Sequence, residues 1–359
     1  MTKNTKSNSD NIDSLIIEPR PSQWFTDEPI EPLYIVLHCS GYNNTLDVFD
    51  KSKVSCHYFI PEQNETDPLL VYEVVKLPLR AWHAGISHWK NDSNLNAYAI
   101  GIEINMPNYA HALENKTLDF LYFENFQEKQ IKALQILVNQ LQQQYNIPAE
   151  NVVGHADIAA WRNISGETIM SRTDPGPTFP WKILAKNGIG LWPEGDCPET
   201  IKKNLTAIQA QGLLRAVGYN VPLTGEFDTE TNLTMGAARL HFEPNCFNQT
   251  SGSAHACYEK SFDSNLACSL YALNSHHAPE SNVSSSSTLF LLLAFGSPTL
   301  LLLFFLGCLL YRRYTQTSSE EKVNERTSLL SKFSHFSPDH STQSATKNES
   351  YQASLCSIF

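Results

Sequence analysis

Two histidines and one aspartate have the side chains that bind zinc. His38 closes the apolar run YIVL at residues 34–37, His155 follows the run VVG at residues 152–154, and Asp174 lies in the segment RTDPGP. Imidazole nitrogens and one carboxylate suit zinc, and three protein ligands leave a fourth position for water. Zinc lowers the pKa of that water toward about 7, which provides a nucleophile at neutral pH. We therefore predict a zinc site, although a lone histidine at a strand end is more often structural.

A glutamate lies within a third apolar run. Glu103 is in the segment AIGIEIN, which alternates like a strand. A carboxylate among apolar neighbours is costly to bury without a partner. One interpretation is a general acid/base that takes a proton from water and passes it to a leaving amine. The alternative is a glutamate on an edge strand that faces solvent.

Strand-like and helix-like segments alternate from residue 21 to residue 187. Apolar runs of strand length occupy residues 34–37, 54–60, 71–75, 99–104 and 152–153. The segment from Gln127 to Tyr145 has apolar residues at three- and four-residue steps, which predicts an amphipathic helix. This order predicts an α/β fold with a central, mostly mixed β-sheet flanked by helices.

Six segments of this region carry a resemblance to a known family. They are, in chain order, VLHCSGYN, SCHYFI, RAWHAG, NAYAIGIEIN, VVGHADIA and RTDPGPTFPW. They resemble the AmpD/AmiD-type N-acetylmuramoyl-L-alanine amidases, a zinc amidase family related to peptidoglycan recognition proteins. The resemblance implies hydrolysis of the amide bond between N-acetylmuramic acid and L-alanine in peptidoglycan or its fragments, the muropeptides.

The resemblance also implies roles for individual residues. His38, His155 and Asp174 correspond to the zinc ligands, and Glu103 corresponds to the catalytic acid/base. Arg172 stands where the family usually has lysine, two residues before the metal-binding aspartate. A cation there would stabilise the oxyanion of the tetrahedral intermediate. The rival interpretation is a non-catalytic, membrane-anchored peptidoglycan recognition receptor. Because no candidate ligand is missing, catalysis is favoured.

Trp82 and His83 match a family segment that lines the substrate groove. Tyr58 matches the SxHY-like segment of the family, and substrate contact is the expectation for it as well. The aromatic ring of Trp82 could stack on sugar or peptide, and the alternative is that it packs in the core. One departure is a longer spacing between His155 and Asp174, with the extra stretch at residues 161–171. A surface loop accommodates such an insert at little entropic cost, but this loop must also position a metal ligand.

The region after the sheet has the pattern of a separate small helical unit. Residues 201–217 and 229–242 have helical patterns, and Gly218 is a helix stop. This unit resembles a three-helix peptidoglycan-binding module, although Ala238 and Arg239 stand where an aromatic–Gln pair is common. The predicted organisation is a disordered segment at 1–20, the amidase domain at 21–187, the module at 188–245, a stalk with cysteines and serines at 246–287, a transmembrane helix at 288–311 and a disordered cytosolic tail at 312–359.

The prediction of a membrane span depends on an uncharged apolar run. Residues 289–311 carry no charge and are followed at once by Arg312 and Arg313. Roughly 20 apolar residues cross a bilayer, and the arginines place the C-terminal side in the cytosol. The alternative is a buried core helix. Because the N-terminal residues are polar and lack the apolar core of a secretory signal, two routes remain: insertion by the late segment, or a leader missing from this sequence.

Charge, cysteines and glycosylation motifs bear on partners and compartment. The formal net charge of −11 argues against nucleic-acid binding, which needs a basic face. Cys197, Cys246, Cys257 and Cys268 could pair in an oxidising compartment, in a connectivity that spacing does not give. Asn-x-Ser/Thr acceptors begin at nine positions before residue 289, which predicts a glycoprotein with a lumenal or extracellular amidase domain. The tail segment ERTSLL resembles an acidic dileucine signal for endosomes and lysosomes.

Overall fold

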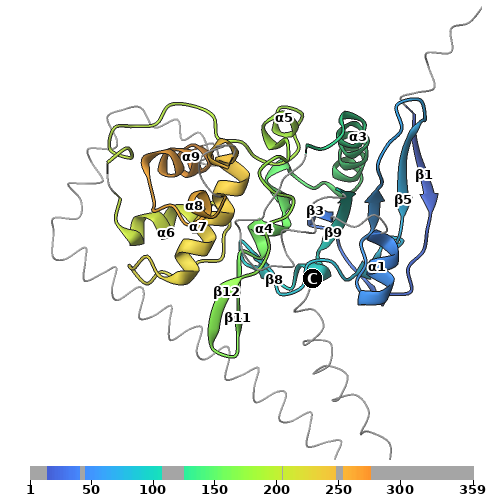
Figure 1. Cartoon of the computed structure of the whole chain (residues 1–359), viewed down its shortest axis with the longest axis horizontal. Coiled ribbons are helices and arrows are strands. Elements are labelled where there is room, and N and C mark those ends of the chain that lie inside the picture. Colours follow the sequence, from blue (N-terminus) through green and yellow to red (C-terminus); the bar gives the residue numbers. More distant parts are fainter. Residues whose placement is uncertain (1–13, 41–44, 107–124, 204, 248–253, 276–359) are drawn as a thin grey trace, which may run out of the picture. The chain divides into compact units, whose positions relative to one another are not determined.

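A six-stranded sheet forms the centre of the fold in the computed structural model (Figure 1). In spatial order its strands are β1 (Leu15–Pro19), β5 (Leu69–Glu73), β4 (Tyr58–Ile60), β9 (Ala99–Asn105), β3 (Tyr34–Ser40) and β10 (Val152–Gly154). Strands β4 and β5 run antiparallel, and the other neighbours run parallel. The sheet is therefore mixed, as predicted. The structure describes residues 14–40, 45–106, 125–203, 205–247 and 254–275.

The central strands are buried on both faces. All seven residues of β9 and the first six of β3 are buried, which suits parallel strands covered on both sides. Because successive side chains point to opposite faces, Tyr34 and Val36 join one core cluster and Ile35 and Leu37 join another. His38 continues the alternation on the Tyr34 face.

Helix α3 (Glu128–Tyr145) covers one face of the sheet (Figure 1). Its buried residues include Leu134, Val138 and Leu141, which pack in the same core cluster as Ile35 and Leu37. A capping box between Gln127 and Gln130 begins the helix, and Asn146 ends it with a left-handed backbone, φ 55°. The predicted helix from Gln127 to Tyr145 is confirmed.

Shorter elements complete the sheet-containing region. They are α1 (Thr45–Ser52), α4 (His155–Ile158), α5 (Trp181–Ala185), and the antiparallel pairs β2 (Phe25–Pro29) with β6 (Leu79–Ala81), β7 (His88–Trp89) with β8 (Asp92–Ser93), and β11 (Trp161–Ile164) with β12 (Glu167–Met170). Cys39 and Cys56 are buried free thiols in this region.

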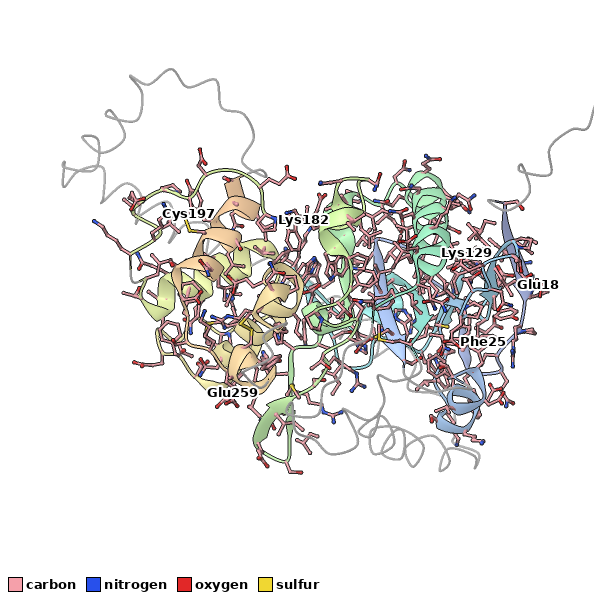
Figure 2. All side chains as sticks on the ribbon, turned by 45° about the horizontal axis from the view of Figure 1, so that its top comes forward. Glu18, Phe25, Lys129, Lys182, Cys197 and Glu259 are labelled. Carbon is pink, nitrogen blue, oxygen red and sulfur yellow. A yellow bond between two sulfur atoms is a disulfide. The ribbon has the colours of Figure 1, made fainter. Side chains whose placement is uncertain are left out.

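Four α-helices follow the sheet-containing region within the described residues. They are α6 (Ala207–Val217), α7 (Thr229–Phe242), α8 (Ala254–Tyr258) and α9 (Ser264–Ser275). We call residues 197–275 the helical module. Disulfides Cys197–Cys268, whose Cys197 end is labelled in Figure 2, and Cys246–Cys257 cross-link it. One core cluster continues from Val36 and Val153 of the sheet into Leu214 and Leu240 of the module. The module therefore shares a core with the sheet.

Two predicted boundaries differ from the structure. The predicted stalk at 246–287 contains α8 and α9, because Leu266 and Leu270 are buried against the rest of the module. The predicted disordered segment at 1–20 contains β1, because Leu15–Pro19 pairs with β5 as an edge strand. The peptidoglycan-binding role predicted for the module stays a prediction.

The prediction of a single-pass membrane protein, with an amidase domain in a lumenal or extracellular space, is corrected. Within the described ranges, no helix is both long enough and apolar enough to cross a membrane. The longest of these helices, α3, has 18 residues and is polar on its exposed face. The predicted span at 288–311 and the predicted tail at 312–359 lie outside the described residues.

Candidate metal centre and active site

Two strand ends and one loop bring the predicted zinc ligands together. His38 lies near the carboxyl end of β3, and His155 begins α4 directly after β10, which pairs with β3. Asp174 lies in the loop that leads to α5. Parallel strands end at one edge of a sheet, and this edge is where open α/β sheets hold their ligands. The backbone N–H of Ala156 donates to the Asp174 carbonyl at 2.8 Å, which fixes the loop against α4.

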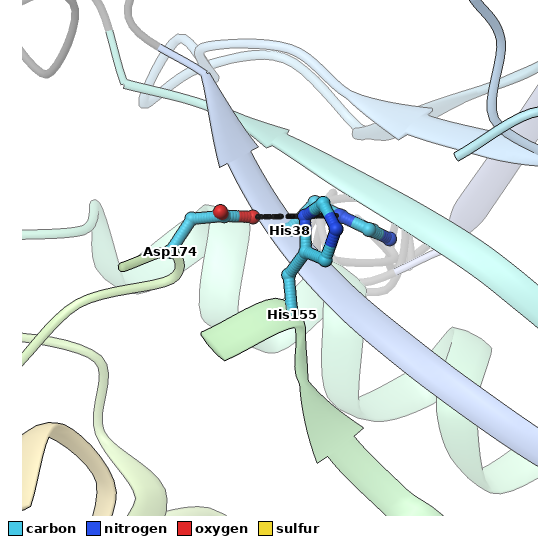
Figure 3. A group of neighbouring side chains, drawn as sticks. All are labelled: His38, His155 and Asp174. Carbon is cyan, nitrogen blue, oxygen red and sulfur yellow. Dashed lines mark hydrogen bonds and ion pairs between the residues drawn. The ribbon is translucent and has the colours of Figure 1, made fainter. Parts of the chain in front are cut away.

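The ligand atoms of these residues converge on one point (Figure 3). His38 Nδ1 and His155 Nδ1 are 3.0 Å apart, and they lie 3.4 and 3.2 Å from Asp174 Oδ2. In a tetrahedral site with metal–ligand bonds of about 2.0–2.1 Å, two ligand atoms are about 3.3 Å apart. The three separations therefore fit a single zinc ion. All three side chains are buried.

The charge state of the cluster also suits a cation. Burial, together with the charge of His155, lowers the pKa of His38 to about 4, so its imidazole is neutral at neutral pH. Burial alone would raise the pKa of Asp174, but the neighbouring His155 and His38 hold it well below its usual range. His155 Nε2 donates to the Ala84 carbonyl at 3.3 Å, which leaves its Nδ1 as an acceptor. Acceptor atoms this close repel one another unless a cation lies between them.

Glu103 lies beside this cluster on the neighbouring strand. It pairs with His38 in the β3–β9 register and is 5% exposed. Among the described residues its Oε1 has no hydrogen-bond partner. Burial and then the charge of Asp174 raise its pKa well above the usual value, and a hydrogen bond from Ser40 opposes the shift. A buried carboxyl group with a raised pKa is typical of a catalytic acid/base.

Arg172 lies at the base of the loop that carries Asp174. Its backbone N–H donates to the Ala159 carbonyl and its Nη1 to the Ser171 carbonyl, both at 3.1 Å. Burial and then the charge of His155 are the main causes that lower the pKa of His38, and the positive charge of Arg172 adds a smaller contribution in the same direction. The oxyanion role predicted for Arg172 stays a prediction.

Two residues predicted to bind substrate have other neighbours. Trp82 is half-buried, its Nε1 donates to Thr26 Oγ1 at 2.8 Å, and its ring lies 6.3 Å from that of Trp24. Tyr58 packs in the α3-facing core cluster, on the face of the sheet opposite to His38. Burial, followed by the charge of Glu73, raises the pKa of Tyr58 to about 12. The structure does not bring Tyr58 to the metal cluster.

His83 lies directly against a metal ligand. Its Nδ1 is 3.0 Å from His38 Nε2, and its Nε2 donates to the Ala99 carbonyl at 3.2 Å. Burial lowers its pKa well below the usual value, and the neighbouring His38 adds to that shift. His83, which the sequence predicts to contact substrate, therefore contacts the metal ligand His38 at the ring nitrogen that points away from the metal cluster.

The insert between His155 and Asp174 forms the β11–β12 hairpin. Ser171 N–H donates to the Ala160 carbonyl at 3.1 Å, which joins the end of the hairpin to its beginning. Thr168 Oγ1 donates to Glu230 Oε1 of α7 at 2.7 Å. The hairpin is thus attached to the helical module, and the chain returns Asp174 to the two histidines.

Sequence reasoning missed a buried polar group next to the site. Asp157 accepts hydrogen bonds from Gly154 N–H at 2.8 Å and Tyr219 Oη at 2.6 Å, and its Oδ2 lies 2.8 Å from His241 Nδ1. The His241 ring stacks on Trp181 at 3.9 Å. No pattern in the sequence indicates this group, because its members are brought together only by packing between α4 and the helical module.

Comparison with known proteins agrees with the fold and the site. The family model for N-acetylmuramoyl-L-alanine amidase matches residues 27–177. N-acetylmuramoyl-L-alanine amidase AmiD of Escherichia coli is 32% identical over 247 residues, which cover 64% of this chain and 83% of the relative. The chain belongs to the N-acetylmuramoyl-L-alanine amidase family, which is a family of enzymes. 1,6-anhydro-N-acetylmuramyl-L-alanine amidase AmpD of Citrobacter freundii is 31% identical over 129 residues, which cover 36% of this chain and 54% of that protein.

Solved structures extend the similarity beyond the sheet. AmpDH3 of Pseudomonas aeruginosa is 28% identical with a TM-score of 0.56, over 70% of this chain and 94% of that one. AmiD of Escherichia coli, in complex with the substrate anhydro-N-acetylmuramic acid-L-Ala-D-gamma-Glu-L-Lys, is 28% identical with a TM-score of 0.53, over 72% of this chain and 93% of that one. Because each match covers more of the chain than the family model does, it includes residues outside 27–177.

Proposed function

We propose that this enzyme is a zinc-dependent amidase that cleaves the bond between N-acetylmuramic acid and L-alanine in peptidoglycan or muropeptides. The observation that carries the proposal is the convergence of His38, His155 and Asp174 on one point, with ligand-atom separations of 3.0–3.4 Å. The family model and the names of the relatives support the choice of bond. A ligand set of two imidazoles and one carboxylate supports zinc.

Each residue of the site has a role in this proposal. His38, His155 and Asp174 would hold zinc, which supplies a Lewis acid that activates water and polarises the amide carbonyl. Glu103 accepts the proton of the attacking water and delivers it to the leaving amine of alanine. Burial, together with the charge of Asp174, raises the pKa of Glu103 above its usual value, which favours a carboxyl group that holds the proton before it passes to the amine. Arg172 places positive charge near the oxyanion.

The proposed substrates are muropeptides. AmiD was solved with anhydro-N-acetylmuramic acid-L-Ala-D-gamma-Glu-L-Lys, and AmpDH3 with an anhydromuramic pentapeptide. These two complexes support a substrate that contains a muramyl group and a stem peptide. A receptor that binds the same ligands without cutting them would not need Glu103 at a buried position beside the three ligands, so catalysis is the better account.

The proposal is tested by incubating the purified protein with muropeptides and following released stem peptide by mass spectrometry. We expect release by the wild type, loss of release with a zinc chelator, and recovery when zinc is added back. His38→Ala and Asp174→Ala should lose bound zinc by metal analysis, whereas Glu103→Ala should keep zinc and lose turnover. Binding of muropeptides without any release by the zinc-loaded wild type would favour the receptor and reject the amidase.

A further inference from the structure

His38 offers one ring nitrogen to the metal cluster and the other to His83. Its Nδ1 lies 3.0 Å from His155 Nδ1, and its Nε2 lies 3.0 Å from His83 Nδ1. A neutral imidazole carries its proton on one nitrogen and a lone pair on the other. Only the form with the proton on Nε2 leaves the Nδ1 lone pair free for a metal.

The backbone fixes the proton of His83. A carbonyl oxygen only accepts hydrogen bonds, so the 3.2 Å contact between His83 Nε2 and the Ala99 carbonyl places the His83 proton on Nε2. Nδ1 of the neutral His83 ring is then an acceptor, and its partner in the described part of the chain is His38 Nε2, which must carry the proton for a hydrogen bond to form. The Ala99 carbonyl thus determines the tautomer of His38 through His83.

We infer that His83 is a positioning residue, which holds His38 in the tautomer and orientation that present Nδ1 to zinc. This inference rests on the proposed function, because it assigns a role toward the zinc site, and it replaces the substrate contact predicted from the sequence. Metal-binding histidines commonly donate the N–H of their second ring nitrogen to a carboxylate, a backbone carbonyl or water. Removal of that acceptor weakens metal binding roughly 10- to 100-fold. Here the partner is another imidazole instead of a carboxylate or carbonyl.

A glycine makes room for His83 against the sheet. A Cβ atom built on Gly101 would lie 2.4 Å from His83 Cγ, 2.6 Å from Cδ2 and 2.7 Å from Nδ1. Gly101 lies on β9 two residues before Glu103, on the same face. The missing side chain of the strand therefore leaves the space in which the His83 ring reaches both Ala99 and His38.

His57 provides a matched control. It is a buried histidine whose ring lies 5.7 Å from that of His83. Its Nδ1 accepts from Gly101 N–H and its Nε2 donates to the Leu79 carbonyl, both at 3.0 Å. Both nitrogens are satisfied by backbone, so His57 is structural. Its substitution should disturb packing in the same region without acting on His38.

The test compares zinc affinity in three variants by competition with a chromophoric chelator. His83→Leu removes the acceptor and should weaken zinc binding roughly 10- to 100-fold. His83→Asn keeps an acceptor near the Nδ1 position, so its zinc affinity should stay within about threefold of wild type, a smaller change than the loss expected for His83→Leu. The zinc affinity of the control His57→Asn should stay within the same limit. Wild-type affinity in His83→Leu, or an equal loss in all three variants, would overturn the inference.

A second measurement reads the tautomer directly in the metal-free protein. Long-range ¹H–¹⁵N NMR spectra distinguish the two neutral imidazole forms, and the signals of His38 are identified by their loss in His38→Ala. We expect the Nε2–H form in wild type and His57→Asn and a mixture in His83→Leu. The same tautomer in every variant contradicts the inference. Because no zinc is present, this result stands apart from the proposed function, which fails if wild type binds no zinc.

Discussion

Tyr219 donates a 2.6 Å hydrogen bond to Asp157, so the helical module contacts the short helix that carries His155. Asp157 lies two residues after His155, and it also accepts the backbone N–H of Gly154 at 2.8 Å, which begins that helix. His241 of α7 lies 2.8 Å from Asp157 Oδ2, the oxygen that also accepts Gly154 N–H, whereas Tyr219 donates to Oδ1. The module therefore packs against one side of the metal centre.

This contact predicts that Tyr219→Phe lowers both stability and zinc affinity. Loss of a hydrogen bond to a buried carboxylate should reduce the free energy of unfolding by about 1.5–3 kcal/mol. The zinc dissociation constant should rise, because Asp157 then holds α4 less firmly. Urea unfolding and chelator competition measure the two effects.

Tyr258→Phe is the control for this prediction. Tyr258 Oη donates to the Leu233 carbonyl at 3.2 Å, a bond within the module. This variant should lose about 1 kcal/mol of stability and keep the zinc affinity of wild type. If Tyr219→Phe also keeps that affinity, the module supports the fold but not the metal centre.

Glu103→Gln is expected to separate metal binding from turnover. Glutamine has the shape of glutamate but cannot accept a proton from water, so kcat on muropeptides should fall roughly 10²- to 10⁴-fold. Metal analysis should find the same zinc content as in wild type. Glu73→Gln, a partly buried glutamate of β5 in the same sheet, should leave both quantities unchanged. A Glu103→Gln enzyme with wild-type kcat would remove Glu103 from the mechanism.

Gly101→Ala should act through His83. The new methyl group would come within 2.4 Å of the His83 ring and push it away from His38. Zinc affinity should fall about as far as in His83→Leu, roughly tenfold or more. The double variant should show little additional loss, because both changes remove one interaction.

The matched control is Gly212→Ala in α6. A Cβ at Gly212 would have nothing within 4 Å. Alanine is favoured over glycine in a helix interior by about 0.8–1.0 kcal/mol, so this variant should be as stable as wild type or more stable, with unchanged zinc affinity. Additive losses in Gly101→Ala combined with His83→Leu would show that Gly101 acts by another route.

The two histidine ligands could be predicted from sequence because their positions follow from strand ends, whereas Asp174 lies in a loop and was indicated only by its motif. An apolar run followed by histidine places that histidine at the edge of a parallel sheet. Both His38 and His155 follow such a run and lie at this edge. Helix α3 was predictable for a similar reason, since its buried positions recur at three- and four-residue steps. These features depend on local periodicity, which a single sequence contains.

Features that depend on register or on distant packing were not predictable. Tyr58 and Phe59 are adjacent on β4, and a one-residue difference decides which side chain faces α3 and which faces the His38 side of the sheet. His83 follows Trp82 in a loop, where periodicity gives no direction for a side chain. Helix α9 is held by burial of Leu266 and Leu270 against the rest of the module and by the disulfide of Cys268.

Acidification should destabilise the metal-free protein through its buried histidines. Burial lowers the pKa of His57 to about 4, against 6.5 for an ordinary histidine. Below pH 6.5 the unfolded chain therefore binds a proton that the folded state excludes. His57 contributes stability that is fully present above pH 6.5 and falls by up to about 1.4 kcal/mol per pH unit down to about pH 4. Urea unfolding at several pH values measures this slope.

His57→Asn checks the assignment of that slope. Asparagine does not titrate, so the difference in stability between wild type and the variant should shrink as the pH falls from 6.5 toward 4. His38 should contribute a slope of the same sign, because its pKa is also lowered to about 4. Parallel pH profiles for wild type and His57→Asn would show that His57 is protonated in the folded state.

The two disulfides should differ in their contribution to stability. Cys197–Cys268 joins residues 71 apart, and Cys246–Cys257 joins residues 11 apart. The longer loop removes more conformational entropy from the unfolded chain, which corresponds to about 4 kcal/mol against about 3 kcal/mol. The double variant Cys197→Ala/Cys268→Ala should therefore have a lower urea midpoint than Cys246→Ala/Cys257→Ala. The longer link also ties the segment before α6 to α9, so its loss should free α9 from the core first and expose Leu266 and Leu270 to solvent. Hydrogen exchange of α9 measures that step, and equal protection of α9 in the two variants would mean that packing alone holds the helix.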